Sequence, residues 1–367
     1  MWLVRDKALT NCPGPVSFKS IESNTTRRPF AYRALTPIMV KAMHVLSTDT
    51  RAKTGRYLKE HISGLENYAK YTCTSDEHLL DLIALTCFIW LSFFLTMLTA
   101  RGLFGVLFEH AAFAQNAAGP CALLSITYLF KGGGHIFYDP PTVFLVSASI
   151  WMMTIQRWKL FYFTLIVALL NKETACIVSV AFFAYYLSVL PRKSLLKHLT
   201  AQCLLYVLLR VAIIAWLDPG TSEAANNNIL RDYFGKNLMA LWNARFWLDY
   251  VSQMALLGLV ALICRRFADQ PRLLRRSSLM SIPLMAGYFK SGLWGEVRVF
   301  YDIFPLLFLM GYKNLLELLG YRLVVQASEV GGTLLSIKAQ SMAWSCIIAV
   351  IGIVLMASTI AVCRSLF

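Results

Sequence analysis

The chain has 367 residues, of which 57% are hydrophobic, and it carries a formal net charge of +15. Its mean hydropathy of +0.56 exceeds what a soluble domain carries. The basic residues are spread over loops between apolar runs, so the positive charge does not indicate nucleic-acid binding. No stretch alternates as a barrel strand would. The composition therefore predicts an all-α, polytopic transmembrane helical bundle.

The N-terminal part of the chain differs from the rest. Residues 1–78 contain no convincing membrane span, and we describe them as a basic N-terminal region. Within it, residues 31–46 are expected to form a basic amphipathic helix at the membrane interface, with an apolar face made by Ile38, Val40, Met43 and Leu46. Residues 79–367 are expected to form the transmembrane helical domain.

The transmembrane domain contains a series of apolar stretches, which predict about nine crossings if one stretch is broken or re-entrant. They are 79–100, 102–130 with an interruption at Gly119–Pro120, 142–156, 160–170, 174–190, 199–217, 247–264, 278–294, 299–316 and 343–363. The third and fourth are shorter than a bilayer-spanning helix, which predicts a polar recess in the membrane beside them.

Three short basic loops set the expected orientation. Arginine and lysine gather at residues 157–159, 192–197 and 265–276. Short loops rich in these residues stay in the cytoplasm. The turns between the basic loops are therefore expected on the non-cytoplasmic face.

Those turns contain three polar segments, which we call the polar islands: 138–141 (YDPP), 171–174 (NKET) and 295–298 (GEVR). An ionisable group at membrane depth is costly and usually serves a function. The islands supply three candidate catalytic carboxylates, namely Asp139, Glu173 and Glu296. Nearby cations that could bind a phosphate are Lys172, Arg298, Lys290 and Arg210. This combination suits a lipid-phosphate donor whose phosphate is held while a hydroxyl group loses its proton.

Each island also has a structural interpretation. Asp139 is suited to cap the following helix, with a proline of the island in the first turn. Residues 172–173 are compatible with a solvated turn, and residues 296–298 with a structural ion pair. Arg210 alone is compatible with a side chain that extends to the membrane interface.

Metal-binding patterns are not evident in the sequence. The nine cysteines form no C-x-x-C pair, and the six histidines show no metal-ligand spacing. We therefore predict no protein-only metal site and no required cofactor, although the charged islands are compatible with a divalent metal.

Four motifs occur in a familiar order: RPFAYRALTP at residues 28–37, Y-D-x-P at 138–141, LNKET at 170–174 and E-x-R-x-F at 296–300. Together they resemble bacterial multi-pass proteins related to the GT-C superfamily of membrane glycosyltransferases. Lys172 stands where arginine is usual in that pattern, which keeps the charge but loses bidentate geometry. The resemblance adds Arg33 and Tyr138 to the expected substrate-binding residues.

The resemblance implies a GT-C-like enzyme in the bacterial cytoplasmic (inner) membrane. Such an enzyme moves a sugar from a polyprenyl-phosphate donor to a glycan or protein acceptor at the outer face, in contact with membrane lipid. The alternative is a non-enzymatic membrane protein, either a transporter of a lipid-linked sugar or a structural subunit with partners in a larger membrane complex. A transporter predicts internal repeats and a polar path to both faces, and the sequence has no evident repeat.

Overall fold

Helices dominate the structure, which is a computed structural model. It describes residues 34–36, 38–39, 47–71, 74–109, 112–131, 139–217, 262–291 and 301–326. Of these residues 86% are helical, so the prediction of a mainly helical protein is confirmed for this part of the chain. Its β-structure is one antiparallel pairing of β1 (Phe108–Glu109) with β2 (Val324–Val325).

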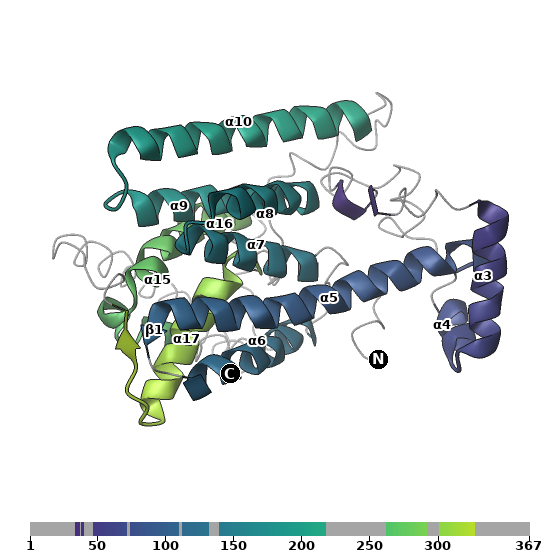
Figure 1. Cartoon of the computed structure of the whole chain (residues 1–367), viewed down its shortest axis with the longest axis horizontal. Helices are drawn as coiled ribbons and strands as arrows, with labels where there is room; N and C mark the ends of the chain where they lie inside the picture. The colour runs from purple at the N-terminus through teal and green to yellow at the C-terminus, as the bar shows by residue number, and fades with distance from the viewer. Residues whose placement is uncertain are drawn as a thin grey trace, which may run out of the picture.

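Figure 1 shows the described helices, taken here in chain order. The first are α3 (Thr48–His61), α4 (Leu65–Tyr71) and the long α5 (Asp76–Leu107). The middle of the chain forms α6 (Ala112–Lys131), α7 (Asp139–Thr154), α8 (Trp158–Asn171), the 3₁₀ helix η4 (Glu173–Ile177), α9 (Val178–Tyr186) and α10 (Arg192–Leu217). The last are η5 (Phe267–Asp269), α15 (Arg272–Ser277), η6 (Ser278–Met280), α16 (Ser281–Ser291) and α17 (Phe304–Leu318).

Two helix boundaries expected from the apolar pattern are wrong. α5 is continuous over 32 residues and passes through Arg101. Arg101 is exposed, and its long side chain can reach a polar region without ending the helix. α6 likewise continues through Pro120, and Gly119 brings it so close to α5 that an added Cβ would lie 3.0 Å from the Met97 carbonyl oxygen. The expected division after residue 78 also falls inside α5.

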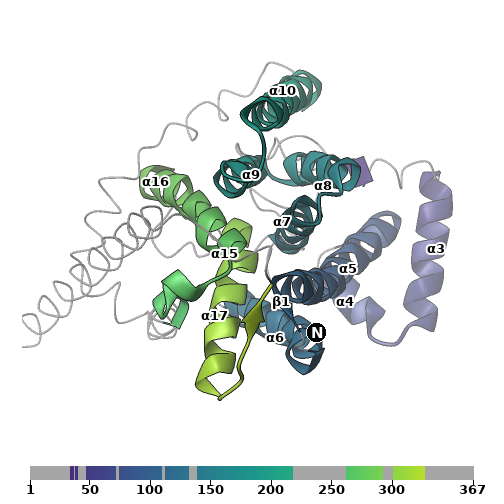
Figure 2. The same cartoon turned by 60° about the vertical axis from the view of Figure 1, so that its left-hand side comes forward.

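Within the described part of the chain, two helices, α5 and Arg192–Trp216 of α10, are long and apolar enough to cross a membrane, as judged by length and composition. Trp158–Asn171 and Glu173–Tyr186 are apolar but shorter. Only 11% of the apolar window of α10 is buried, unlike the core helix of a soluble protein. Figure 2 shows α10 lying outside α8 and α9. The stretches 247–264 and 343–363 lie largely or wholly outside the described residues, and the count of about nine crossings stays a prediction.

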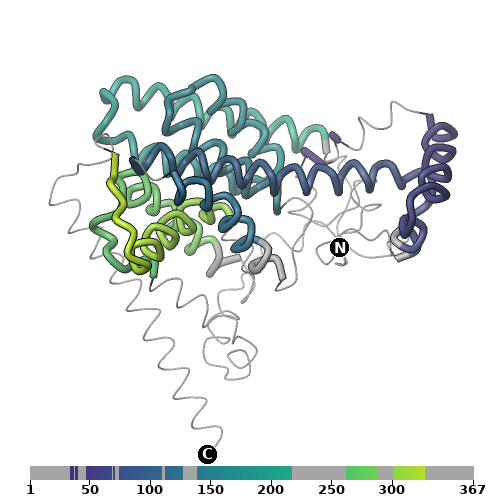
Figure 3. Tube along the Cα trace, turned by 60° about the horizontal axis from the view of Figure 1, so that its bottom comes forward, coloured from purple at the N-terminus to yellow at the C-terminus, as the bar shows by residue number. Residues whose placement is uncertain are grey.

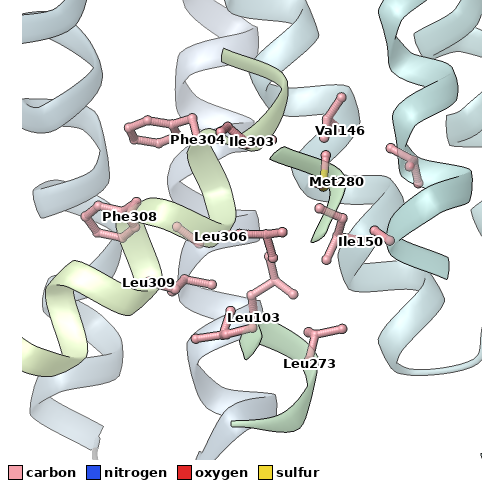
Figure 4. Close-up of a cluster of buried hydrophobic side chains, with 14 of the residues drawn as sticks. Leu103, Val146, Ile150, Leu273, Met280, Ile303, Phe304, Leu306, Phe308 and Leu309 are labelled. Atoms are coloured by element: carbon pink, nitrogen blue, oxygen red, sulfur yellow. The ribbon is translucent and has the colours of Figure 1, made fainter. Parts of the chain in front are cut away.

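The core brings α17 against helices that are far away in the sequence. Figure 4 shows Leu306 and Leu309 of α17 in one apolar cluster with Leu103 of α5, Ile150 of α7 and Leu273 of α15. The Tyr312 hydroxyl group of α17 donates a hydrogen bond to the Ala114 carbonyl oxygen at the start of α6, at 2.9 Å. This packing fixes the position of residues 301–303, which immediately precede α17.

One end of the bundle collects polar residues from the tips of three helices. Asn171 at the end of α8 donates from Nδ2 to the Thr142 hydroxyl group in the first turn of α7, at 2.8 Å. Lys172 pairs with Asp302, which lies just before α17. We call this the island end and define it by residues 139–142, 171–174 and 301–303.

The opposite end collects basic residues, and we call it the arginine end, defined by residues 265–276. The Tyr186 hydroxyl group donates to the Met153 carbonyl oxygen at 2.6 Å, which brings the ends of α9 and α7 together. Arg276 donates to the hydroxyl group of Ser188. The other two basic loops begin within a few residues of Met153 and Ser188, so the three loops share this end.

The N-terminal helices lie on the side of the island end. The pairing of β1 with β2 joins the C-terminal ends of α5 and α17, so the start of α5 points the other way. Figure 3 shows α5 extending beyond the bundle to reach α3. There Arg51 pairs with Asp81 at 3.2 Å, and both side chains are buried. An added Cβ at Gly55 would clash with the Asp76 carbonyl oxygen, so α3 and α5 are tightly packed. The expected interfacial helix at 31–46 lies largely outside the described residues.

Two helix ends use the same backbone turn with different residues. Gln156 after α7 and Gly320 after α17 have positive φ angles of 55° and 89°. In each turn, the residue with positive φ donates its backbone N–H to the carbonyl oxygen three positions before it. The residue that follows it donates its backbone N–H to the carbonyl oxygen five positions before itself. This is the arrangement in which glycine is preferred, because a side chain is strained there.

We therefore expect Gly320→Ala to lower, and Gln156→Gly to raise, the free energy of unfolding by about 1 kcal/mol each, measured in detergent. Gly287→Ala in α16 is the control, since among the described residues no neighbour lies within 4 Å of an added Cβ there. Alanine is favoured in a helix, so this control should be stabilising by up to about 1 kcal/mol. Loss of stability in Gln156→Gly would contradict the strain argument.

Candidate functional site

The second island is built by a break between α8 and η4. Lys172 has extended backbone angles of φ −155° and ψ 130°. The break turns the Lys172 side chain into the bundle, where the residue is only 5% exposed. Asn171, 1% exposed, is held by its bond to Thr142. The solvated-turn interpretation of residues 172–173 is therefore wrong for Lys172.

The Lys172 ammonium group has a buried acidic partner. Its Nζ lies 3.2 Å from Oδ2 of Asp302, and the two side chains are 6% and 0% exposed. The Thr174 hydroxyl group donates to the same oxygen at 2.7 Å. Oδ1 of Asp302 accepts no hydrogen bond from the residues that the structure describes. The positive charge of Lys172 is thus balanced inside the protein.

Asp139 is the first residue of α7 and is completely buried. Pro140 and Pro141 follow it in the first turn, where a proline costs no helical hydrogen bond. The negative charge of Asp139 is favoured by the helix dipole at this position. Thr142, one turn further along, contacts Asn171, so Asp139 lies beside the second island.

Glu173 and Arg210 form the more accessible part of the island end. Both are half-buried, Glu173 at the start of η4 and Arg210 on α10. Both act electrostatically on the Cys176 thiol group and on the Tyr206 hydroxyl group. Asp302 also acts on Cys176. Arg210 therefore belongs to the same charged group as the second island and is not isolated on the outside of α10.

The other predicted site residues are not placed by the described part of the chain. Arg33, Tyr138, Glu296 and Arg298 lie outside the described residues. Lys290 is in the last turn of α16, but only its backbone is described. The structure thus brings together four predicted residues, namely Asp139, Lys172, Glu173 and Arg210.

Asp302 is a candidate site residue that the three polar islands do not include. It lies four positions after Arg298, inside the apolar stretch 299–316. The rule that selects the islands, an ionisable group within an apolar run, applies to Asp302 as well. Among the described residues, no three His, Cys, Asp or Glu side chains are grouped so that they could hold a metal ion.

No family model, curated protein or solved structure matches this chain. The class of protein is therefore defined by the fold and the site alone. It is a helical bundle with an exposed apolar helix, a charged cluster at one end and arginine-rich loops at the other.

Proposed function

We propose that this protein is a multi-pass membrane glycosyltransferase that uses a polyprenyl-phosphate sugar at the non-cytoplasmic face of the bacterial cytoplasmic membrane. The observation that carries the proposal is the gathering of Asp139, Lys172, Glu173, Arg210 and Asp302 at the island end. Acids and bases at membrane depth are costly and mark functional sites.

Membrane placement is supported by the surface of the helices. α10 exposes a continuous series of large apolar side chains, which are Leu204, Val207, Leu208, Val211, Ile214 and Trp216. An exposed apolar surface of this length would be unstable in water and is favourable in lipid. The concentration of basic loops at the arginine end favours the cytoplasm for that end. The island end would then face outward.

In the proposed reaction an acceptor hydroxyl oxygen attacks the anomeric carbon of the donor sugar. The bond from that carbon to the phosphate oxygen breaks, and polyprenyl phosphate leaves with the bonding electrons. Glu173 is the candidate base that takes the hydroxyl proton, because it has a carboxyl group and is only half-buried. Arg210 is the candidate cation for the donor phosphate.

The remaining site residues support these two. Lys172 and Asp302 would hold the segment that carries Glu173, since a buried ion pair fixes geometry. Asp139 would add negative charge beside it. Arg298, Lys290, Arg33 and Tyr138 stay candidate contacts to the donor, and Glu296 stays a candidate second carboxylate.

The test is sugar transfer from a polyprenyl-phosphate donor by the full-length protein in proteoliposomes. We expect a transferred product, and we expect Asp139→Asn to reduce its rate while the protein still inserts. Lys193→Gln at the arginine end is the control and should keep full activity, because it is exposed and far from the island end. Transfer that is unchanged in Asp139→Asn would remove Asp139 from the site.

A second candidate function is a non-enzymatic subunit of a membrane complex. It is favoured by the internal pairing of Lys172 with Asp302, which gives the charge of Lys172 a structural role. The two functions differ in the transfer assay. Inactivity with every polyprenyl-phosphate sugar, together with stable co-purification of a membrane partner, would favour the subunit.

A further inference from the structure

Two arginines at the arginine end are buried and have no acidic partner among the described residues. Arg275 and Arg276 lie on α15 and are 5% and 7% exposed. Arg275 donates to the Ala268 carbonyl oxygen at 2.7 Å, and Arg276 donates to the Ser188 hydroxyl group. Both partners are neutral. Within the described part of the chain, no carboxylate lies at salt-bridge distance from either guanidinium group.

The surroundings of this pair are further positive. Arg272, one turn earlier on α15, stacks over the Tyr185 ring with its guanidinium carbon 5.4 Å from the ring centroid. Burial lowers the pKa of both Arg275 and Arg276, and the charge of Arg272 lowers it further. Arg272 therefore destabilises the positive charges of Arg275 and Arg276, and Arg275 destabilises that of Arg276.

The orientation of the protein in a membrane does not explain why Arg275 and Arg276 are buried. A basic loop that stays in the cytoplasm needs only charge, and exposed residues such as Arg192 and Lys193 supply it. A buried charge normally has a partner of opposite sign, because removal from water is costly. Arg275 and Arg276 are consecutive in the chain, and among the described residues both have only neutral hydrogen-bond partners, an arrangement that an anion would complete.

We propose that Arg275 and Arg276, together with Ser188, bind a phosphate group carried by an anionic ligand at the arginine end. Guanidinium groups match phosphate through paired N–H donors, and a hydroxyl group adds a third donor. Arg272, one turn before Arg275 on α15, is half-buried and reaches the protein surface. Leu187, next to Ser188, is 56% exposed and offers an apolar surface for an acyl chain. An anionic phospholipid headgroup therefore fits the position.

This site is separate from the proposed sugar transfer and shares with it only the membrane placement. It is tested by thermal unfolding of the full-length protein in neutral detergent with phosphatidylcholine, with phosphatidylglycerol added or not. We expect phosphatidylglycerol to raise the Tm of the natural protein by roughly 3 °C. The Tm of the double variant Arg275→Gln/Arg276→Gln should not respond. In neutral lipid this variant should melt at or above the natural protein, because it lacks two buried charges that have no acidic partner among the described residues.

The matched control is Arg192→Gln/Lys193→Gln, which removes two exposed charges from the same end. It should respond to phosphatidylglycerol as the natural protein does. An equal loss of response in this control would contradict the proposed site, because it would show that general surface charge causes the rise in Tm. So would a Tm of the Arg275/Arg276 variant well below the natural protein in neutral lipid. Inorganic phosphate alone is a separate arm: an equal Tm rise would assign the site to free phosphate, and no rise would assign it to the lipid.

Discussion

Replacement of Asp302 by asparagine is expected to lower the free energy of unfolding by about 3–5 kcal/mol. Asparagine keeps the shape of the side chain but leaves the buried Lys172 ammonium group without its counter-charge. Such a charge has little access to water, because Lys172 is only 5% exposed. Unfolding in detergent with a chemical denaturant measures the loss.

Two variants separate this effect from simple loss of a contact. Lys172→Met/Asp302→Leu removes both charges and should recover most of the stability, since apolar replacements of a buried pair are often neutral. Asp49→Asn breaks the exposed pair of Asp49 with Lys53, in which both side chains are 74% exposed, and should cost less than about 1 kcal/mol. An equally small loss in Asp302→Asn would show that the Lys172 pair is not isolated from water.

The second large effect is expected at Glu173. If Glu173 is the base of the proposed transfer, Glu173→Gln should lower the rate roughly 10²-fold to 10⁴-fold, because proton transfer in the transition state is lost. Arg210→Gln should instead raise the KM for the polyprenyl-phosphate donor. Both are measured in proteoliposomes with the full-length protein.

The control for Glu173 is Glu66→Gln, which changes an exposed carboxylate on α4 that pairs with Lys70. It should keep the natural rate. A correctly inserted Glu173→Gln protein with full activity would exclude Glu173 as the base and direct attention to Glu296. A stability loss in Glu173→Gln as large as that of Asp302→Asn would indicate a structural role instead.

Part of the site follows from local sequence and part does not. The prolines of the first island predict the start of a helix, and α7 begins there with both in its first turn. The alternation of basic loops with islands predicts that 138–141 and 171–174 share an end, and Asn171 contacts Thr142 there. The partner of Lys172 is 130 positions away in the chain. The rule that selects the islands also fits Asp302, but no local rule pairs Lys172 with Asp302 and not with another acid.

The errors in helix boundaries have the same origin. Arg101 and Pro120 look like interruptions in a linear apolar pattern, because a charge or a proline alone is unfavourable in a membrane helix. In the fold, Arg101 is exposed near one end of α5, and Gly119 packs α6 closely against Met97 of α5. Exposure of Arg101 and close packing beside Pro120 therefore let both helices continue, and neither feature can be read from the linear pattern.

The sequence by itself determined the helical class, the apolar exterior and the separation of basic loops from polar islands, because hydropathy and charge act through local composition. Only the tertiary structure decided that Lys172 is neutralised by Asp302, that Arg210 and Glu173 both act on Cys176, and that Arg275 and Arg276 are buried with no acid among the described residues. The reason is physical: the state of a charge depends on its partners and its access to water, and folding sets both by packing distant segments together.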